Sequence, residues 1–186
     1  MESVMISIQP KWCTLISLGE KYIEIRKTKP KIEAPFNCYI YCTSIKNILG
    51  LEYRTLNAAT DGKIFDWHKK VIGEFTCDGI YEFETEISNR ANAYEAITLR
   101  RESEDFNEYG DYRYSLVSEN GDNANWLMHQ SCVMWNDLKK YLGYKSREFY
   151  GWRIRSIEIY DKPKTLAEFG LTRPPQSWCY VKELTK

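Results

Sequence analysis

The stretch Gly19–Lys27, GEKYIEIRK, alternates in the manner of a β-strand and carries charge on both faces. With a period of two, one face of the strand carries Tyr22, Glu24 and Arg26. The other face carries Lys21, Ile23 and Ile25. The polar face is either the solvated side of a surface strand, with a weak ion pair, or the floor of a binding cleft. Because charge is common on strands, spacing alone favours the solvated face.

Signals on either side place this stretch between a short helix and further strands. VMISI, residues 4–8, predicts a first strand. Pro10 then suits the start of a helix, and Gly19 suits its end. After a polar connection with two prolines, FNCYIYCT, residues 36–43, predicts a third strand.

The later strand signals are longer and interrupted. KVIGEFTCDGIYEFE, residues 70–84, predicts a strand that bends at Gly79. In FYGWRIRSIEIY, residues 149–160, the alternation shifts partway along, which indicates a bulge or twist. SWCYVKEL, residues 177–184, predicts a closing strand. Strands dominate without a βαβ rhythm, so we expect an α+β protein, a small mixed β-barrel with short peripheral helices.

The length and composition indicate one globular domain over residues 1–186. Hydrophobic residues make up 43% of the chain and charged residues 28%, which excludes a disordered protein. Residues 84–122 are acidic, rich in Asn and Tyr, and weakly patterned, so we interpret them as a polar insertion. An alternative role for this acidic insertion is to contact a protein partner.

Charge and aromatic content bear on the ligand. With 26 basic and 26 acidic residues the net charge is zero, which argues against a protein that holds long nucleic acid by bulk electrostatics. The 14 tyrosines, 7 phenylalanines and 6 tryptophans exceed what a core of this size needs. Aromatic rings are suited to stacking on a planar ligand such as a nucleobase.

Metal, cofactor and membrane functions find no support in the sequence. The six cysteines form no CxxC pair and there are two histidines, His68 and His129, so we expect no metal site and no cofactor. Cysteines in strand-like runs, such as Cys38 and Cys77, are expected to be buried free thiols. With no apolar run of membrane-spanning length, we expect a cytoplasmic protein.

Several segments together resemble the ASCH domain, a family related to PUA domains, in the form found in bacterial and phage proteins. The segments that carry the resemblance are ISIQPKWCTLISLGEKYIEIRKTKP, KVIGEFTCDGIYEFE, SCVMWNDLKKYLG, YGWRIRSIEIYDKPKTLAEF and PPQSWCYVKEL. They span most of the chain. The most specific element is the spacing of a glycine, a lysine, a glutamate and an arginine, here Gly19, Lys21, Glu24 and Arg26.

The resemblance implies a PUA-like barrel with a cleft between the first helix and the barrel. In the family this cleft is a proposed site for RNA or a modified nucleoside, and the resemblance places Lys21, Glu24 and Arg26 along it. It therefore favours the cleft floor over the solvated face. Some small members are amidohydrolases of N4-acylated cytidine, and others have been described as ribonucleases. The amidohydrolases pair the lysine with a threonine three residues later, where this chain has Glu24, so their catalytic triad is incomplete here.

The three charged residues have the chemistry for either function. Arg26 presents a planar fork of donors to a phosphate or a base edge. Glu24 accepts from an exocyclic amine such as that of cytosine. Lys21 contacts a phosphate or carbonyl as a binding residue, and in an enzyme Lys21 and Glu24 would transfer protons. We therefore predict binding of RNA or a modified nucleotide, with the amidohydrolase or ribonuclease as the alternative.

Further candidates for ligand binding lie elsewhere on the chain: Lys11, Trp12, Ser131, Cys132, Trp152, Gln176 and Ser177. Trp12 either packs on the barrel or stacks on a ligand. Ser131 and Cys132 precede a predicted helix, where they either cap it or present donors to a ligand. Trp152 is more typical of a core, and Gln176 and Ser177 offer amide and hydroxyl contacts.

Overall fold

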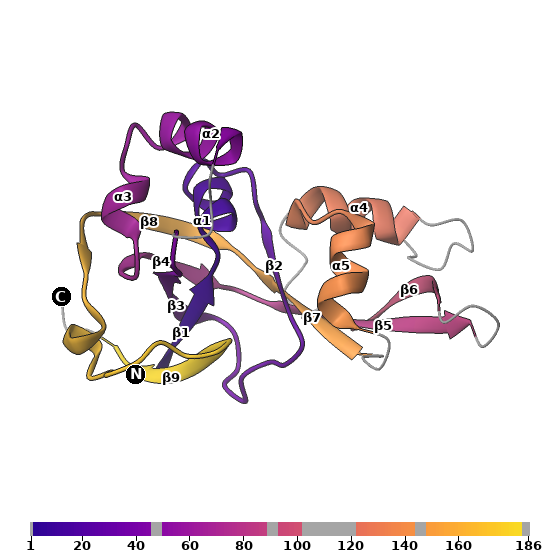
Figure 1. Cartoon of the computed structure of the whole chain (residues 1–186). Helices are drawn as coiled ribbons and strands as arrows, with labels where there is room; N and C mark the ends of the chain where they lie inside the picture. Colours follow the sequence, from indigo (N-terminus) through magenta and orange to yellow (C-terminus); the bar gives the residue numbers. More distant parts are fainter. Residues whose placement is uncertain (1, 46–49, 89–92, 102–121, 144–147, 184–186) are drawn as a thin grey trace. The chain divides into compact units, whose positions relative to one another are not determined.

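The computed structural model describes residues 2–45, 50–88, 93–101, 122–143 and 148–183, which form two compact units. Unit 1 comprises Met1–Lys21, Pro35–Cys77 and Ile154–Lys186, and unit 2 comprises Tyr22–Ala34 and Asp78–Arg153. Each unit contains one β-sheet and its own helices (Figure 1). The single domain over residues 1–186 stays a prediction.

The sheet of unit 1 has five strands in the order β8-β4-β3-β1-β9. Their bounds are β1 Glu2–Ile8, β3 Phe36–Cys42, β4 Val71–Cys77, β8 Arg155–Lys164 and β9 Trp178–Lys182. Strand β1 runs parallel to β3, and the other neighbours are antiparallel. The strands predicted at the start, middle and end of the chain are therefore confirmed.

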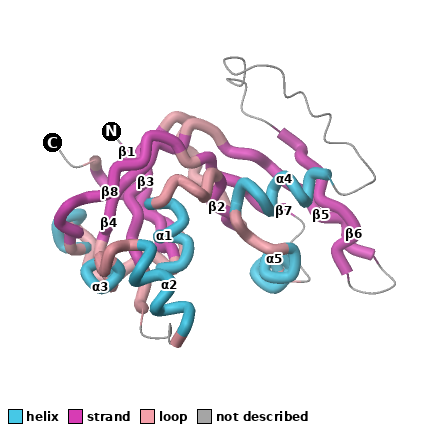
Figure 2. Tube along the Cα trace, turned by 90° about the horizontal axis from the view of Figure 1, so that it is seen from above, coloured by secondary structure: helices cyan, strands magenta, loops and turns pink. Residues whose placement is uncertain are grey.

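Three helices lie on one side of this sheet, as Figures 1 and 2 show: α1 Pro10–Ser17, α2 Leu51–Ala59 and α3 Ile64–Trp67. Helix α1 begins with Pro10 in its first turn, where the missing N–H costs nothing, and buries Cys13 and Ile16. Gly19 follows the helix with φ of +69°, a left-handed conformation that favours glycine. The predicted helix and both of its boundary residues are confirmed.

A core cluster of unit 1 lies beside a buried polar network. Its apolar members are Met5, Tyr39, Tyr41, Val71, Phe169 and Val181, with Phe169 supplied by the 3₁₀ helix Leu166–Phe169. Beside it, the buried Glu74 accepts hydrogen bonds from Asn37 Nδ2 and the Tyr160 hydroxyl, both at 3.0 Å. Burial, reinforced by the Glu74 charge, raises the pKa of Tyr160 far above its ordinary value. This network therefore joins β3, β4 and β8 through side chains.

The sheet of unit 2 has four antiparallel strands in the order β2-β7-β5-β6. Their bounds are β2 Ile23–Arg26, β5 Ile80–Ser88, β6 Ala93–Arg101 and β7 Glu148–Arg153. Helices α4, Asp122–Ser131, and α5, Trp135–Leu142, lie over one face (Figure 1). That face holds the core of the unit: Ile23, Ile25, Tyr81, Phe83, Leu127, Leu138, Leu142 and Phe149.

The α+β class is confirmed, but the closed barrel is not, because the described strands form two separate sheets. Two long strand signals are each divided, and their halves join different sheets. The first divides at Asp78–Gly79, between β4 and β5, and the second at Ile154, between β7 and β8. The bend predicted at Gly79 and the shift in the later alternation mark these two divisions.

The predicted acidic insertion, residues 84–122, includes regular structure. Strand β5 continues to Ser88, and β6 pairs with it from Ala93 to Arg101. Residues 102–121 lie outside the described residues, and the partner predicted for them stays a prediction. Over the described part of the chain, no helix is both long and apolar enough to cross a bilayer.

Candidate functional site

In unit 1, the residues Lys11, Trp12 and Lys21 form a cluster, which we call the Trp12 cluster. Lys11 and Trp12 lie in the first turn of α1. The turn after the helix returns Lys21 to it, because the Lys21 amide donates to the Leu15 carbonyl at 3.2 Å. The Nζ atoms of Lys11 and Lys21 lie 4.7 and 4.9 Å from the centre of the Trp12 ring. Sequence reasoning placed these residues in one site, and the structure brings the three together.

The three side chains of the Trp12 cluster differ in how far they are buried. Lys11 is exposed, Trp12 is half-buried, and Lys21 is only 1% exposed. A buried ammonium group is costly unless opposite charge or a π face compensates for lost water, and Trp is the most favourable ring for this. The cluster therefore combines an indole that is partly open to solvent with two cations near its ring.

In unit 2, Glu24 and Arg26 form an ion pair on β2, with Arg26 Nη2 and Glu24 Oε1 3.0 Å apart. Residues two apart on a strand share a face, so the sequence spacing accounts for the pair. Glu24 is 6% exposed and Arg26 8% exposed, so the reading of this face as the solvated side of a surface strand is wrong. The alternation of the sequence predicted that Glu24 and Arg26 pair, but it did not predict that the ion pair is buried.

The strand register shows what lies beside the pair. Glu24 is opposite Trp152 on β7, and Arg26 is opposite Tyr150. Directly opposite residues of neighbouring strands present their side chains to the same face. Trp152 is fully buried, as is typical of a core position, whereas Tyr150 is half-buried.

Ser131 and Cys132 do not cap the helix that follows them. Ser131 is the buried last residue of α4, and Met134 occupies the N-cap position of α5. The Ser131 hydroxyl instead accepts a hydrogen bond from the Val133 amide at 3.3 Å. Cys132 is half-buried with φ of +56°. The two residues thus shape the turn between the helices, and the N-cap reading is wrong.

Replacing Cys132 with glycine is expected to stabilise unit 2. A non-glycine residue in the left-handed region destabilises the folded state by about 1 kcal/mol, and glycine removes this strain. Part of the gain is lost again, because glycine also gives the unfolded chain more conformational entropy. We expect a net gain of roughly 0.5 kcal/mol in the free energy of unfolding, measured by urea denaturation. A loss of stability in the variant would show that packing of the thiol outweighs the backbone strain.

Gln176 and Ser177 lie in unit 1, directly before β9. The Ser177 carbonyl accepts a hydrogen bond from the Ser7 amide at 2.9 Å, and the Ser7 hydroxyl donates to the Pro175 carbonyl at 2.6 Å. Gln176 is exposed. These two hydrogen bonds join the segment to β1, and a ligand role for its side chains stays a prediction.

Sequence reasoning missed an ion pair between Asp78 and Arg153 in unit 2. Arg153 Nε lies 2.7 Å from Asp78 Oδ1, and the Arg153 Nη2 atom contacts the second carboxylate oxygen. Burial lowers the pKa of Arg153, but the hydrogen bonds and charge of Asp78 outweigh it and raise that pKa above its ordinary value. The two residues are 75 positions apart, so no local pattern could have paired them.

All six cysteines are free thiols, and Cys38 and Cys77 are buried as predicted. Among the described residues, no three or more His, Cys, Asp or Glu side chains are grouped in a way that could hold a metal ion.

Comparison with known proteins gives structural matches only. No family model matches the sequence, and no curated protein matches it. The fold matches the crystal structure of ASCH from Zymomonas mobilis with a TM-score of 0.57 and 14% identity, over 97% of this chain and 88% of that one. A tyrosine-to-phenylalanine mutant of the same protein matches with a TM-score of 0.55 and 15% identity, over 97% and 91%. A serine-to-alanine mutant matches with a TM-score of 0.55 and 15% identity, over 97% and 89%. The two-sheet arrangement of this chain is therefore an ASCH-like fold.

Proposed function

We propose that the protein binds RNA or a modified nucleotide. The observation that carries the proposal is the Trp12 cluster, in which two lysine ammonium groups lie within 5 Å of the ring centre of one half-buried tryptophan. A nucleotide supplies both complements: a planar base for the indole and a phosphate for the ammonium groups. Lys21 is buried and therefore close to its bound position before a ligand arrives, which reduces the entropy lost on binding.

The Glu24–Arg26 pair supports the same class of ligand. A buried ion pair seldom improves stability over apolar side chains of similar volume, so stability alone does not account for the pair. Arg26 carries the donor fork that suits phosphate or guanine, and Glu24 carries acceptors that suit the amines of cytosine or adenine. With a net charge of zero over the whole sequence, we expect few phosphate contacts and a weak dependence on salt.

Two substitutions in the Trp12 cluster test the proposal. Trp12→Leu removes the ring face and Lys21→Met removes the charge while conserving most of the side-chain volume. Trp12→Leu is expected to weaken binding of a cytidine or adenosine nucleotide by about tenfold, because base stacking on an aromatic ring is worth roughly 1–3 kcal/mol. Lys21→Met is expected to weaken it by about tenfold as well, because a hydrogen bond to a charged group contributes roughly 1.5–3 kcal/mol. Trp12→Phe, which conserves an aromatic face, is expected to retain most of the affinity. Calorimetric titration with the four nucleoside monophosphates gives the affinities, and circular dichroism verifies the fold.

The outcome of this titration separates binding from catalysis. Wild-type affinity in both Trp12→Leu and Lys21→Met would remove the Trp12 cluster from the site. The same proteins are to be incubated with N4-acetylcytidine and with short RNAs. Steady product formation that Lys21→Met abolishes would replace the binding proposal with the hydrolase or ribonuclease alternative.

A further inference from the structure

We propose that unit 2 has a second contact surface for single-stranded RNA, formed by residues 27–31, KTKPK, together with Tyr141 and Tyr150. We call it the lysine segment surface. It extends the proposed function from a single nucleotide to a strand and rests on that function for its ligand class. It shares no residue with the Trp12 cluster, so the two can be tested separately.

The lysine segment surface begins where β2 ends. Lys27, Lys29 and Lys31 occupy alternate positions, all three are exposed, and residues 27–31 contain no acidic residue. Pro30 fixes one backbone angle within the segment. Exposed lysines are more often merely solvated, so the lysines alone do not indicate a site.

The tyrosine rings distinguish this segment from an ordinary basic loop. Lys27 Nζ lies 5.3 Å from the centre of the Tyr141 ring, and Lys29 Nζ lies 5.5 Å from that of Tyr150. Tyr141 comes from α5 and is 40% exposed, and Tyr150 comes from β7 and is half-buried. Two elements distant in sequence thus each place a ring beside a lysine of the segment.

This pairing is the composition that proteins use to bind single strands without sequence preference, in which cations contact phosphates and aromatic rings stack on bases. Without a ligand, each ammonium group interacts with its ring. When a strand binds, a base takes the exposed ring face and the ammonium group turns to the adjacent phosphate. An acidic peptide would neutralise the lysines but offers no planar group to the tyrosines, so RNA fits the surface better.

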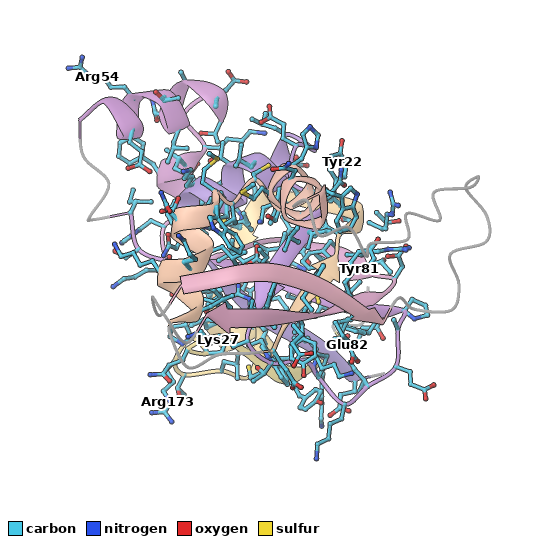
Figure 3. The ribbon with its side chains drawn as sticks, turned by 90° about the vertical axis from the view of Figure 1, so that its right-hand side faces the viewer. Tyr22, Lys27, Arg54, Tyr81, Glu82 and Arg173 are labelled. Atoms are coloured by element: carbon cyan, nitrogen blue, oxygen red, sulfur yellow. The ribbon has the colours of Figure 1, made fainter. Side chains whose placement is uncertain are left out.

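Glu82 modulates the surface. Its carboxylate forms an ion pair with Lys29, and its position on β5 is directly opposite Tyr150 on β7. In Figure 3 both Lys27 and Glu82 lie below the ribbons of β5 and β6, whereas Tyr81 lies above them. The Glu82 carboxylate therefore competes with a phosphate for Lys29. Removing its charge is expected to tighten RNA binding.

The test compares an unstructured 12-nucleotide RNA of alternating cytidine and adenosine with the mononucleotides, over a range of salt concentrations. The variant Lys27→Gln/Lys29→Gln/Lys31→Gln is expected to bind the RNA about tenfold more weakly at low salt and to lower the slope of log K against log salt by roughly 2, at about 0.7 per phosphate contact. Tyr141→Leu is expected to weaken RNA binding by roughly fivefold or more. Glu82→Gln is expected to strengthen RNA binding. Mononucleotide affinity should not change in any of them.

The matched control has the same loss of charge in unit 1. Lys63→Gln/Lys69→Gln/Lys162→Gln replaces three exposed lysines and should bind the RNA like the wild type. Equal losses in both triple variants would show bulk electrostatics and overturn the proposal, as would wild-type RNA affinity in the lysine segment variant or equal affinity of the wild type for polyglutamate. If the wild type binds no mononucleotide but its RNA affinity depends on the lysine segment, the nucleotide site proposed at the Trp12 cluster fails and this inference stands.

Discussion

The Gly73→Ala variant is expected to be less stable than the wild type by about 3 kcal/mol, the upper end of the usual cost of overpacking a core. A β-carbon at position 73 would lie 2.2 Å from the carbonyl oxygen of Glu158 and 3.0 Å from the α-carbon of Ile159. Both atoms belong to the backbone of β8, so neither can rotate away. The register between β4 and β8 shifts on both sides of Gly73–Glu74, so the glycine lies at an irregularity of the pairing, where a close backbone approach often requires glycine.

Gly151→Ala provides the comparison for this prediction. Its β-carbon would meet side-chain atoms only, Ile23 Cγ2 at 2.9 Å and Phe83 Cε2 at 3.0 Å, and these can shift. We expect a loss of about 1–2 kcal/mol for this variant. Urea denaturation measures both losses, and amide hydrogen exchange locates them, with β4 and β8 losing protection in Gly73→Ala. A smaller loss for Gly73→Ala than for Gly151→Ala would contradict the packing described for β4 and β8.

Arg26→Met is expected to destabilise the protein by about 3–5 kcal/mol, because it removes the Arg26 charge from beside the buried Glu24 carboxylate. The double variant Glu24→Met/Arg26→Met is expected to have roughly wild-type stability, since apolar residues of similar volume often replace a buried pair without loss. Urea denaturation of the wild type, Glu24→Met, Arg26→Met and the double variant gives the coupling energy between the two residues.

The double variant also separates a role in binding from a role in folding. If the ion pair contacts a bound nucleotide, the double variant will be folded and will have lost nucleotide affinity. If the double variant binds nucleotides like the wild type, the ion pair has no part in binding. If the double variant is as unstable as Arg26→Met, then Glu24 or Arg26 also stabilises the fold through an interaction with a further residue. Reversing the charge of Arg26 is a poor test, because it buries two carboxylates side by side and threatens the fold.

Local patterns predicted local structure well. Alternation and terminal residues gave β1, β2, β3 and β9, and Pro10 and Gly19 gave the bounds of α1, because strands and caps depend on neighbours in sequence. Strand β6 was missed, since its residues belong to a stretch that reads as a polar insertion. The division into two sheets was also missed, because strand pairing depends on contacts between residues far apart in sequence.

Among the candidate site residues, spacing predicted which side chains share a face, but it did not predict their environment. Spacing placed Glu24 and Arg26 on one face, and they form an ion pair there. Their burial could not be predicted, because a charged strand face normally lies in water and the sequence does not specify what covers it. Lys21 beside Trp12 depends on the turn after α1, and Lys29 beside Tyr150 depends on pairing across the sheet. Neither contact can be predicted from a short stretch of sequence, because the residues that form it are not neighbours in the chain.

The order of strands in the two sheets has a consequence for synthesis on the ribosome. Strand β1 pairs with β9, Trp178–Lys182, so one of its edges stays open until residue 182 has been made. Likewise β2 pairs with β7 and must wait for residues beyond 147. Since translation adds roughly 5–20 residues per second, each early strand is exposed for several seconds with an unpaired edge. We therefore expect nascent chains to need protection from aggregation, and slow translation to lower the yield of native protein.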